Sequence, residues 1–370
     1  MNIPVKLIGT LALAFLLFSC GQNAEKKHLT TSEKIDSVMQ TIPDFSGVVL
    51  VADKGKPIYH QAFGYRNFET KEPNDTTTIF ELASVSKQFT AAIIQMLHEK
   101  RALAYNDTMY KYLKGIPYPN ITIRHLLTHT SGLPDYQAIM DEHWDKSKVA
   151  NNRDIIEYLI KFHPPKSFEP EEKYEYSNTG YVLLASIAEK ASGRDFIEMC
   201  REEIFKLLSM TSTNIRTLSE KATIINFAMG HIYVKEKQRY IRADSFPSSN
   251  YTIWLGNRKG PGRISSTTTD LLKWDQALYT QKILNDSSKL QAFSPMKLKN
   301  DSISNYGFGW DLSNHPVLGK TVSHTGDNPG YKTVIVRFIE KNKTIVILNN
   351  NAHKDFRTLT NTLIALVAHE

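Results

Sequence analysis

The chain has only two cysteines, Cys20 and Cys200, among its 370 residues. A network of several disulfides is therefore excluded, and if Cys20 is modified no disulfide remains possible. The fold must then depend on its hydrophobic core. Hydrophobic residues make up 41% of the chain and charged residues 22%, which is typical of globular proteins. The length exceeds what one core usually supports, so we expect two lobes.

The chain also has no long run of residues with the same charge. The 45 lysines and arginines exceed the 38 aspartates and glutamates by seven, and this mild excess is spread along the chain. No basic block points to a nucleic-acid partner. The chain shows no internal repeat and no low-complexity segment.

Long apolar runs are absent apart from residues 7–18, which follow Lys6 and are too short to span a bilayer comfortably. This pattern predicts a signal peptide over residues 1–19. Its removal takes away only Lys6, so the formal charge falls from +7 to +6. An uncleaved membrane anchor and ordinary secretion are the alternatives.

The segment Leu17-Phe18-Ser19-Cys20 resembles a bacterial lipoprotein box, although Phe18 stands where a small residue is usual. Cys20 would then carry a lipid that holds the chain at the membrane. Residues 20–29 read as a polar tether. We therefore expect a lipoprotein of the bacterial cell envelope that faces the periplasm, or a secreted protein if Cys20 is not lipidated.

The two ends of the chain carry similar patterns. Strands are predicted at residues 47–52, 57–65, 331–339 and 343–349, and helices at residues 32–42 and 356–367. Residues 30–100 and 265–368 are therefore expected to form one α/β lobe. Residues 100–265, rich in helical segments and in loops with proline and tyrosine, would form a mainly helical lobe within a single domain of residues 30–368.

The segment Ser84-Val85-Ser86-Lys87 precedes an apolar helical run and places a hydroxyl and an amine one turn apart on the same helical face. Serine needs a neighbouring base, and a lysine serves only when it is partly neutral. Lowering its pKa from about 10.4 toward 7 takes roughly 4–5 kcal/mol of burial or nearby positive charge. The alternative is an ordinary helix start with a solvated lysine. That alternative fits the second copy, Ser294-Pro295-Met296-Lys297, where a proline and a polar stretch follow.

Tyr176-Ser177-Asn178 runs directly into an apolar helix. The Tyr176 phenol would carry protons if a cation such as Lys87 lowered its pKa. Asn178 offers both a donor and an acceptor to Lys87 and to a substrate amide. The Tyr-x-Asn tripeptides that begin at Tyr65 and Tyr118 are better explained as packing or turn residues.

His324-Thr325-Gly326 follows a strand predicted at residues 320–323. The glycine would let a substrate lie against the strand edge, and the backbone N–H of Asp327 would complete an oxyanion pocket. The alternative is a strand end and turn with an exposed His324.

The stretch from His125 to Leu133 has two histidines four residues apart, a spacing that metal ligands on a helix can have. No glutamate follows His125 as a zinc-protease helix requires, and no third ligand is evident. We expect helix packing and a polar loop that faces the cleft, with no metal and no cofactor.

In chain order, the four segments are those that begin at Ser84, His125, Tyr176 and His324. Together and in that order they resemble the class C branch of the serine β-lactamase and penicillin-binding protein family, which includes D-alanyl-D-alanine carboxypeptidases and lactamase-like esterases. A fifth segment, from Gly262 to Trp274, resembles the glycine-then-helix stretch of that family. The resemblance covers about residues 30–368. It implies an α/β (α+β) fold of the β-lactamase/transpeptidase type, in which helices flank an antiparallel sheet beside a mainly helical lobe.

The resemblance also implies a two-step acyl transfer. Ser84 would attack a carbonyl, while Lys87 and Tyr176 would share the proton transfers. The backbone N–H groups of Ser84 and Asp327 would hold the oxyanion.

The other matched residues would bind the substrate. Asn178 would orient it, and His324, Thr325 and Gly326 would contact it.

Two departures from the family pattern narrow the substrate. A lysine at position 324 would be a permanent cation for a carboxylate, whereas His324 is mostly neutral, so carboxylate binding should be weaker or more dependent on pH. Asp327 stands where a small neutral residue is common, and its charge would disfavour anionic substrates.

We therefore expect a serine hydrolase that cleaves an amide or ester in a small molecule or a peptide, such as a D,D-peptide of cell-wall type or a β-lactam. A lactamase-like esterase and a penicillin-binding sensor that does not turn over are the alternatives. Nothing in the sequence indicates the oligomeric state.

Overall fold

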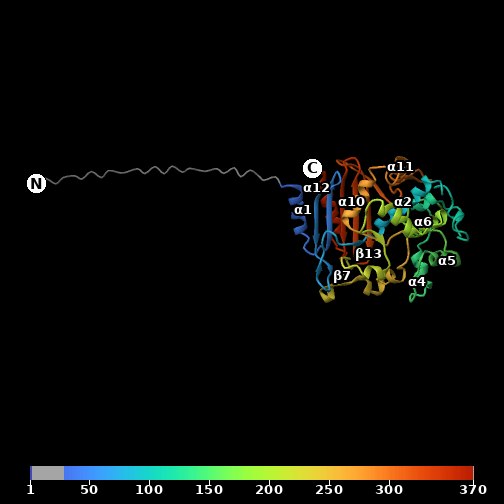
Figure 1. Ribbon diagram of the computed structural model, residues 1–370, viewed down its shortest axis with the longest axis horizontal. Helices are drawn as coiled ribbons and strands as arrows, with labels where there is room; N and C mark the ends of the chain where they lie inside the picture. The colour runs from blue at the N-terminus through green and yellow to red at the C-terminus, as the bar shows by residue number, and fades with distance from the viewer. Residues whose placement is uncertain (2–28, 370) are drawn as a thin grey trace.

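A computed structural model describes residue 1 and residues 29–369 of the chain (Figure 1). The rest of the predicted signal peptide, Cys20 and the tether up to residue 28 lie outside the described residues. No helix in the described part is both long enough and apolar enough to cross a bilayer.

A six-stranded sheet, with strands in the order β12-β13-β14-β15-β1-β2, forms the centre of the molecule. All five pairings are antiparallel. β1 pairs with β15 from Gly47 opposite Asn349 to Asp53 opposite Lys343, so the two ends of the chain meet inside the sheet. The strands are β1 (Gly47–Asp53), β2 (Lys56–Phe63), β12 (Asp311–His315), β13 (Gly319–Asn328), β14 (Tyr331–Phe338) and β15 (Lys343–Asn349).

Helices cover both faces of this sheet. Alternate residues of a strand face opposite sides, so Val49 and Val51 pack toward α1 (Thr31–Gln40) and α12 (Phe356–Ala368), whereas Leu50 belongs to the larger core on the other side. Figure 1 shows α1 and α12 on one side of the sheet and α10 (Thr268–Ala277), α2 (Lys87–Glu99) and α6 (Asn178–Ser192) on the other.

The remaining elements are short helices and two- to four-residue strands, apart from α5. The helices are α3 (Ile123–Leu127), α4 (Tyr136–His143), α5 (Asn152–Phe162), α7 (Phe196–Cys200), α8 (Leu218–Ala222), α9 (Tyr251–Trp254) and α11 (Asp286–Ala292), with helical turns η1 (Ala83–Ser86), η2 (Met109–Lys111), η3 (Arg201–Lys206), η4 (Lys235–Lys237), η5 (Ala243–Ser245) and η6 (Pro247–Ser249). The strands are β3 (Tyr65–Asn67), β4 (Glu72–Pro73), β5 (Phe80–Glu81), β6 (Asn214–Ile215), β7 (His231–Val234), β8 (Arg239–Arg242), β9 (Ile264–Ser266), β10 (Met296–Lys297) and β11 (Ile303–Ser304).

The predicted α/β fold, an antiparallel sheet flanked by helices, is confirmed. The strands expected at residues 47–52, 331–339 and 343–349 are β1, β14 and β15, and the two terminal helices are α1 and α12. The strand expected at residues 57–65 is shorter, because Gly64 adopts a φ of +63° and breaks it before Tyr65. The division into an α/β lobe and a helical lobe stays a prediction.

A buried ion pair fastens α10 to the sheet. Arg337 of β14 and Asp275 of α10 have side chains that are 1% and 0% exposed. The Asp275 carboxylate also accepts a hydrogen bond from Thr344 of β15 at 2.8 Å, and the Arg337 guanidinium donates to the Asp275 carbonyl at 3.0 Å. The two charges therefore compensate each other between α10 and two adjacent strands.

Replacing Asp275 by asparagine should destabilise the protein by about 3–5 kcal/mol, because the Arg337 charge would stay buried without its partner. The control is Glu157→Gln, which removes an i,i+4 pair with Arg153 whose two side chains are 55% and 85% exposed. That change should cost about 0–1 kcal/mol. Urea unfolding of both variants measures the difference, and equal values would contradict a structural role for the buried pair.

Candidate active site

The candidate nucleophile lies at a helix start, as the sequence predicts. Ser84 belongs to the turn η1, and Lys87 is the first residue of α2, which follows directly. Ser84 is the only residue between Ile79 and Leu97 that is not fully buried. Its hydroxyl is therefore the reactive group that this segment presents to a ligand.

Lys87 is brought against Ser84 by three contacts. Its amine lies 3.1 Å from the Ser84 hydroxyl, 2.8 Å from the side-chain oxygen of Asn178 and 3.0 Å from the carbonyl of Pro261. Asn178 is the first residue of α6, so two helices and one loop meet at this amine. The structure thus gathers three residues that the sequence predicts for the site.

The Lys87 side chain is fully buried, and no carboxylate of the described residues pairs with its amine. Burial lowers the pKa of Lys87 well below 10.5, and the positive charge of Arg258 lowers it further. The neutral amine can accept a proton, which a solvated lysine cannot do at pH 7. This geometry supplies the base that the Ser84 hydroxyl needs.

Tyr176 lies beside the same amine, which sits 4.7 Å from the centre of its ring. The expectation that a cation would lower the pKa of Tyr176 is wrong. Burial of the hydroxyl raises the pKa of Tyr176, and a hydrogen bond with Ser84 offsets only part of that effect. The raised pKa keeps the Tyr176 phenol protonated near neutral pH, so the phenol has a proton to offer.

His324, Thr325 and Gly326 lie inside a strand and not after one, because β13 continues to Asn328. Thr325 is exposed, whereas His324 is 2% exposed, so the alternative of an exposed histidine is wrong. The His324 ring contacts the Tyr306 hydroxyl at 2.8 Å and the Thr325 carbonyl at 2.6 Å. Burial and the charge of Lys87 lower the pKa of His324 to about 3. His324 therefore does not titrate near pH 7 and cannot cause the expected pH dependence of carboxylate binding there.

Gly326 sets the distance between β13 and the nucleophile segment. A β-carbon at this position would lie 2.3 Å from the Leu82 carbonyl and 2.2 Å from the Thr333 hydroxyl, so only glycine fits. β12 pairs with β13 only as far as Ser323, which leaves residues 324–328 with β14 as their one strand neighbour among the described residues. An open strand edge therefore passes next to Ser84, and the Asp327 side chain at that edge is exposed.

His129 forms the back of the site. It is 1% exposed, its ring lies 4.3 Å from Tyr176 and 4.6 Å from Tyr306, and its Nδ1 accepts the backbone N–H of Ser177 at 3.1 Å. His125 instead contacts Glu171 at 3.1 Å. The two histidines therefore face different neighbours, and no group of three possible metal ligands occurs among the described residues.

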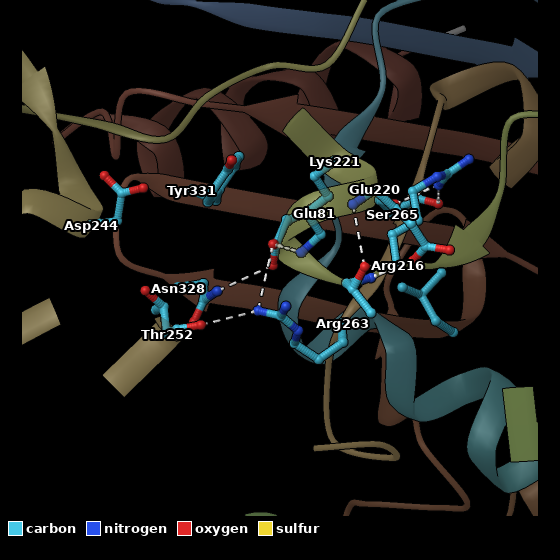
Figure 2. A network of polar contacts seen from close by, with 12 residues as sticks. Glu81, Arg216, Glu220, Lys221, Asp244, Thr252, Arg263, Ser265, Asn328 and Tyr331 are labelled. Atoms are coloured by element: carbon cyan, nitrogen blue, oxygen red, sulfur yellow. Dashed lines mark hydrogen bonds and ion pairs between the residues drawn. The ribbon is translucent and has the colours of Figure 1, made fainter. Parts of the chain in front are cut away.

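A buried charge network that sequence reasoning missed fixes the segment before Ser84 (Figure 2). Glu81 of β5 pairs with Lys221 of α8, lies 3.8 Å from Arg263 and accepts a hydrogen bond from Asn328 at 3.3 Å. Burial raises the pKa of Glu81, but Lys221, Arg263 and Arg258 lower it more, to about 2. Burial lowers the pKa of Lys221 to about 8 against the opposing effect of Glu81. The network ties β5, α8, the loop before β9 and the end of β13 together.

Three of the thirteen non-glycine residues with positive φ in the described part of the chain lie around the same place. Ala83, His129 and Arg263 have φ values of +48°, +57° and +80°, which residues with a β-carbon rarely adopt. Such strain costs of order 1–3 kcal/mol per residue and gathers at functional sites. Ala83 immediately precedes Ser84, so this strain is part of how the hydroxyl is aimed.

The second Ser-x-x-Lys copy, at Ser294 and Lys297, has no buried lysine next to its serine. The Ser294 hydroxyl donates to the Leu290 carbonyl at 2.6 Å, and the Lys297 amine pairs with Asp301 at 2.6 Å on the surface. Both groups are already satisfied, and Lys297 is solvated as expected. The expected helix start is wrong, because Ser294 follows the end of α11 and Lys297 lies in β10.

Residues 35–369 match the family described as Beta-lactamase. Penicillin-binding protein 4* of Bacillus subtilis (strain 168) is 42% identical over 331 residues, which cover 88% of this chain and 72% of that protein. A D-aminopeptidase of Cereibacter sphaeroides (strain ATCC 17023) is 23% identical over 347 residues, which cover 91% of this chain. The match spans only 64% of that enzyme's own length.

Two solved structures show the same fold. The octameric penicillin-binding protein homologue from Pyrococcus abyssi superimposes with a TM-score of 0.78 at 25% identity, covering 91% of this chain and 77% of the other. The D-amino acid amidase from Ochrobactrum anthropi SV3, complexed with L-phenylalanine amide, gives a TM-score of 0.73 at 22% identity, with coverage of 91% and 99%.

Replacing Arg258 by glutamine should raise the pKa of Lys87, because Arg258 is the charge that lowers it. Less of the amine is then neutral at a given pH, so the acidic limb of the pH profile for acylation of Ser84 should move to higher pH. The rate at which p-nitrophenyl acetate acylates the protein, followed from pH 5 to 10, measures the shift. Arg153→Gln, at a side chain 85% exposed, is the control and should leave the profile in place.

Proposed function

Because the chain belongs to the β-lactamase family, we propose that it is a serine hydrolase that cleaves amides through an acyl-enzyme on Ser84. The observation that carries the proposal is the Lys87 amine, which is buried without a carboxylate partner 3.1 Å from the Ser84 hydroxyl. The Tyr176 hydroxyl also hydrogen-bonds Ser84, but burial raises the pKa of Tyr176, whereas it lowers the pKa of Lys87, so Lys87 is the better suited of the two to take the proton.

The proposed acylation step balances its protons within the site. The neutral Lys87 amine takes the proton of the Ser84 hydroxyl as the serine oxygen bonds to the substrate carbonyl carbon. Tyr176, which stays protonated, gives its proton to the departing nitrogen as the amide bond breaks. Proton transfer from Lys87 to the tyrosine oxygen then restores both residues. Water attacks the acyl-enzyme in the second step by the same relay.

The backbone N–H groups of Ser84 and Asp327 are proposed to hold the oxyanion. The approach of β13 to η1 that Gly326 permits supports this assignment. Asn178 would orient the substrate amide with its N–H₂ group, because its side-chain oxygen already binds Lys87. The strand edge at residues 324–328, with Thr325 exposed, would pair with an extended substrate.

We propose that the substrate is a small amide or peptide with a D-configured residue, of which a cell-wall peptide or a β-lactam is an example. The names of the relatives support this class, since they include penicillin-binding proteins, a D-aminopeptidase and a D-amino acid amidase. All the proton transfers run through side chains of the site, so the proposed reaction uses no cofactor or metal.

Lipidation of Cys20 stays a proposal from the sequence, as does the resulting place at the bacterial cell envelope. Cys20→Ser should release the protein from the membrane fraction and abolish the incorporation of labelled fatty acid. Membrane association and labelling that survive this change would overturn the proposal in favour of an uncleaved anchor. Release without any labelling of the parent would favour secretion.

Ser84→Ala should abolish cleavage of D-alanine amide, of a D-Ala-D-Ala peptide and of p-nitrophenyl acetate, with at least a 10³-fold loss. Adduct mass and product release are followed together. The matched control is Ser294→Ala, which alters the other Ser-x-x-Lys copy and should leave every rate unchanged. A Ser84→Ala variant as active as the parent would overturn the nucleophile. Ester turnover without amide cleavage would make the protein an esterase, and a stable adduct without turnover would make it a sensor.

A further inference from the structure

A cavity of about 950 Å³ lies outside the candidate active site, and none of the residues proposed for catalysis or substrate binding lines it. Its walls come from α5, α6, β6 and the loop at residues 256–259. Figure 1 shows α5 and α6 on the side of the sheet away from α1 and α12. Cavities that hold small organic ligands typically measure about 300–1,000 Å³, so this one has the size of a binding site.

Positive charge is in excess around this cavity. Seven lysines and arginines line it but only three glutamates, which leaves four positive charges in surplus. Two of the glutamates already pair with cations of the same lining. Lys114, Lys190 and Arg258, in contrast, make no ion pair with any residue that the structure describes. A cavity lined in this way attracts anions.

Arg258 differs from every other arginine in the described part of the chain that is not exposed, because its side chain forms neither a hydrogen bond nor an ion pair. Its Nε and Nη1 atoms are buried without a partner, and its guanidinium lies 5.8 Å from the ring of Tyr251. The charge of Arg258 reaches Glu81, but Lys221 already pairs with that carboxylate. A guanidinium that lacks acceptors is costly, and an oxyanion would compensate it.

Apolar side chains form another part of the lining. Leu113 and Ile215 are buried there, and Ile156 and Ile197 are half-buried. An inorganic anion would leave this surface to water, so the lining is better suited to an organic anion. The planar guanidinium pairs with carboxylates and phosphates alike, which makes either group a match for Arg258.

We propose that this cavity binds an organic anion whose carboxylate or phosphate pairs with Arg258 while its apolar part lies against Leu113, Ile156 and Ile215. This site is separate from Ser84, and the binding itself does not depend on the proposed function.

The segment that follows Arg258 leads directly to the Lys87 amine. Asn152, which lines the cavity, exchanges two hydrogen bonds with the backbone of Lys259, at 2.7 and 3.1 Å. Two residues further on, the Pro261 carbonyl accepts the Lys87 amine at 3.0 Å. The proposed partner of the anion is therefore only three residues away from a group that holds the base of the active site.

A bound anion should consequently regulate acylation, an effect that rests on the proposed function. The charge of Arg258 lowers the pKa of Lys87, and an anion at Arg258 would compensate that charge. The pKa of Lys87 should then rise, and less of the amine would be neutral at a given pH. The ligand would act as an inhibitor of Ser84 that does not occupy the site of Ser84.

Binding is tested in the Ser84→Ala background, where no turnover interferes. Isothermal titration calorimetry at low ionic strength compares 2-naphthoate and 2-naphthyl phosphate with 2-naphthamide, which has a similar apolar body and no charge. At least one of the anions should bind about tenfold or more tightly than the amide, and the tighter one identifies the preferred group. Equal affinities for all three compounds would overturn the inference.

Arg258→Gln should reduce the preference for the anion to less than about threefold. The matched control is Arg357→Gln, which makes the same change at an exposed arginine of α12, on the other side of the sheet (Figure 1). The preference should persist there. A preference that survives Arg258→Gln, or one that disappears in Arg357→Gln, would show that Arg258 is not the partner.

A second variant locates the ligand without removing a charge. Ile156→Trp places a larger side chain into the cavity from α5 and should weaken the binding of all three compounds. Leu290→Trp, at a position of α11 that is 65% exposed, is the control and should leave the affinities unchanged. Unaltered affinities in Ile156→Trp would place the ligand elsewhere on the molecule.

The regulation is tested on the parent protein through the rate at which p-nitrophenyl acetate acylates it. A saturating anion should move the acidic limb of the pH profile to higher pH by about 0.5–1 unit, and should cause no further shift in Arg258→Gln. An unchanged profile would contradict the coupling to Lys87. Competition with the ester that persists in Arg258→Gln would place the anion at Ser84 and overturn the separate site.

The other titratable groups around Lys87 do not produce such a shift. Tyr176 and Tyr181 have raised pKa values, and His129 and His324 have lowered ones, so all four are neutral around pH 7. Because binding is measured without Ser84, a failure of the nucleophile and a failure of the anion site are separate results.

Discussion

The site depends on a lysine that is buried without an opposite charge. Each pKa unit by which Lys87 is lowered corresponds to about 1.4 kcal/mol that the fold must supply. The large core beneath α2 supplies it, since every residue from Val85 to Leu97 is buried. Three oxygens, from Ser84, Asn178 and Pro261, receive the amine in place of water. The Asn178 and Pro261 oxygens can accept the two N–H groups of a neutral amine, which leaves its lone pair for the Ser84 hydroxyl. None of the three oxygens carries a charge, so the amine is held in place while it remains a base.

Charge is distributed differently on the two sides of Ser84. On one side Glu81 is surrounded by Lys221, Arg263 and Arg258, and these cations keep its pKa at about 2. On the other side Asp311 is alone, and burial raises its pKa to about 6. The first carboxylate is a structural tie between segments that bracket the nucleophile.

Local patterns in the sequence predicted the residues that lie on regular elements. Ser84 and Lys87 share a helix start, Asn178 opens α6, and the terminal strands and helices were recognisable from their periodicity. The strand that contains His324 was predicted too short, because Gly326, Asp327 and Asn328 have weak strand propensity and only the pairing with β14 extends the strand through them.

Features that arise from long-range contacts were not predictable. Glu81 and Lys221 are 140 residues apart, so no spacing rule connects them. The raised pKa of Tyr176 follows from burial, which the tripeptide Tyr-x-Asn does not encode.

The titration of the Lys87 amine tests the central claim most directly. Lysines labelled with ¹³C at the ε-carbon can be followed by NMR from pH 5 to 11, and a Lys87→Arg variant identifies the resonance. The account predicts a midpoint well below 10.5, with the amine largely neutral under the conditions in which Ser84 reacts. A midpoint at or above 10.5 would contradict it, because Lys87 would then be a fixed cation and Ser84 would have no base.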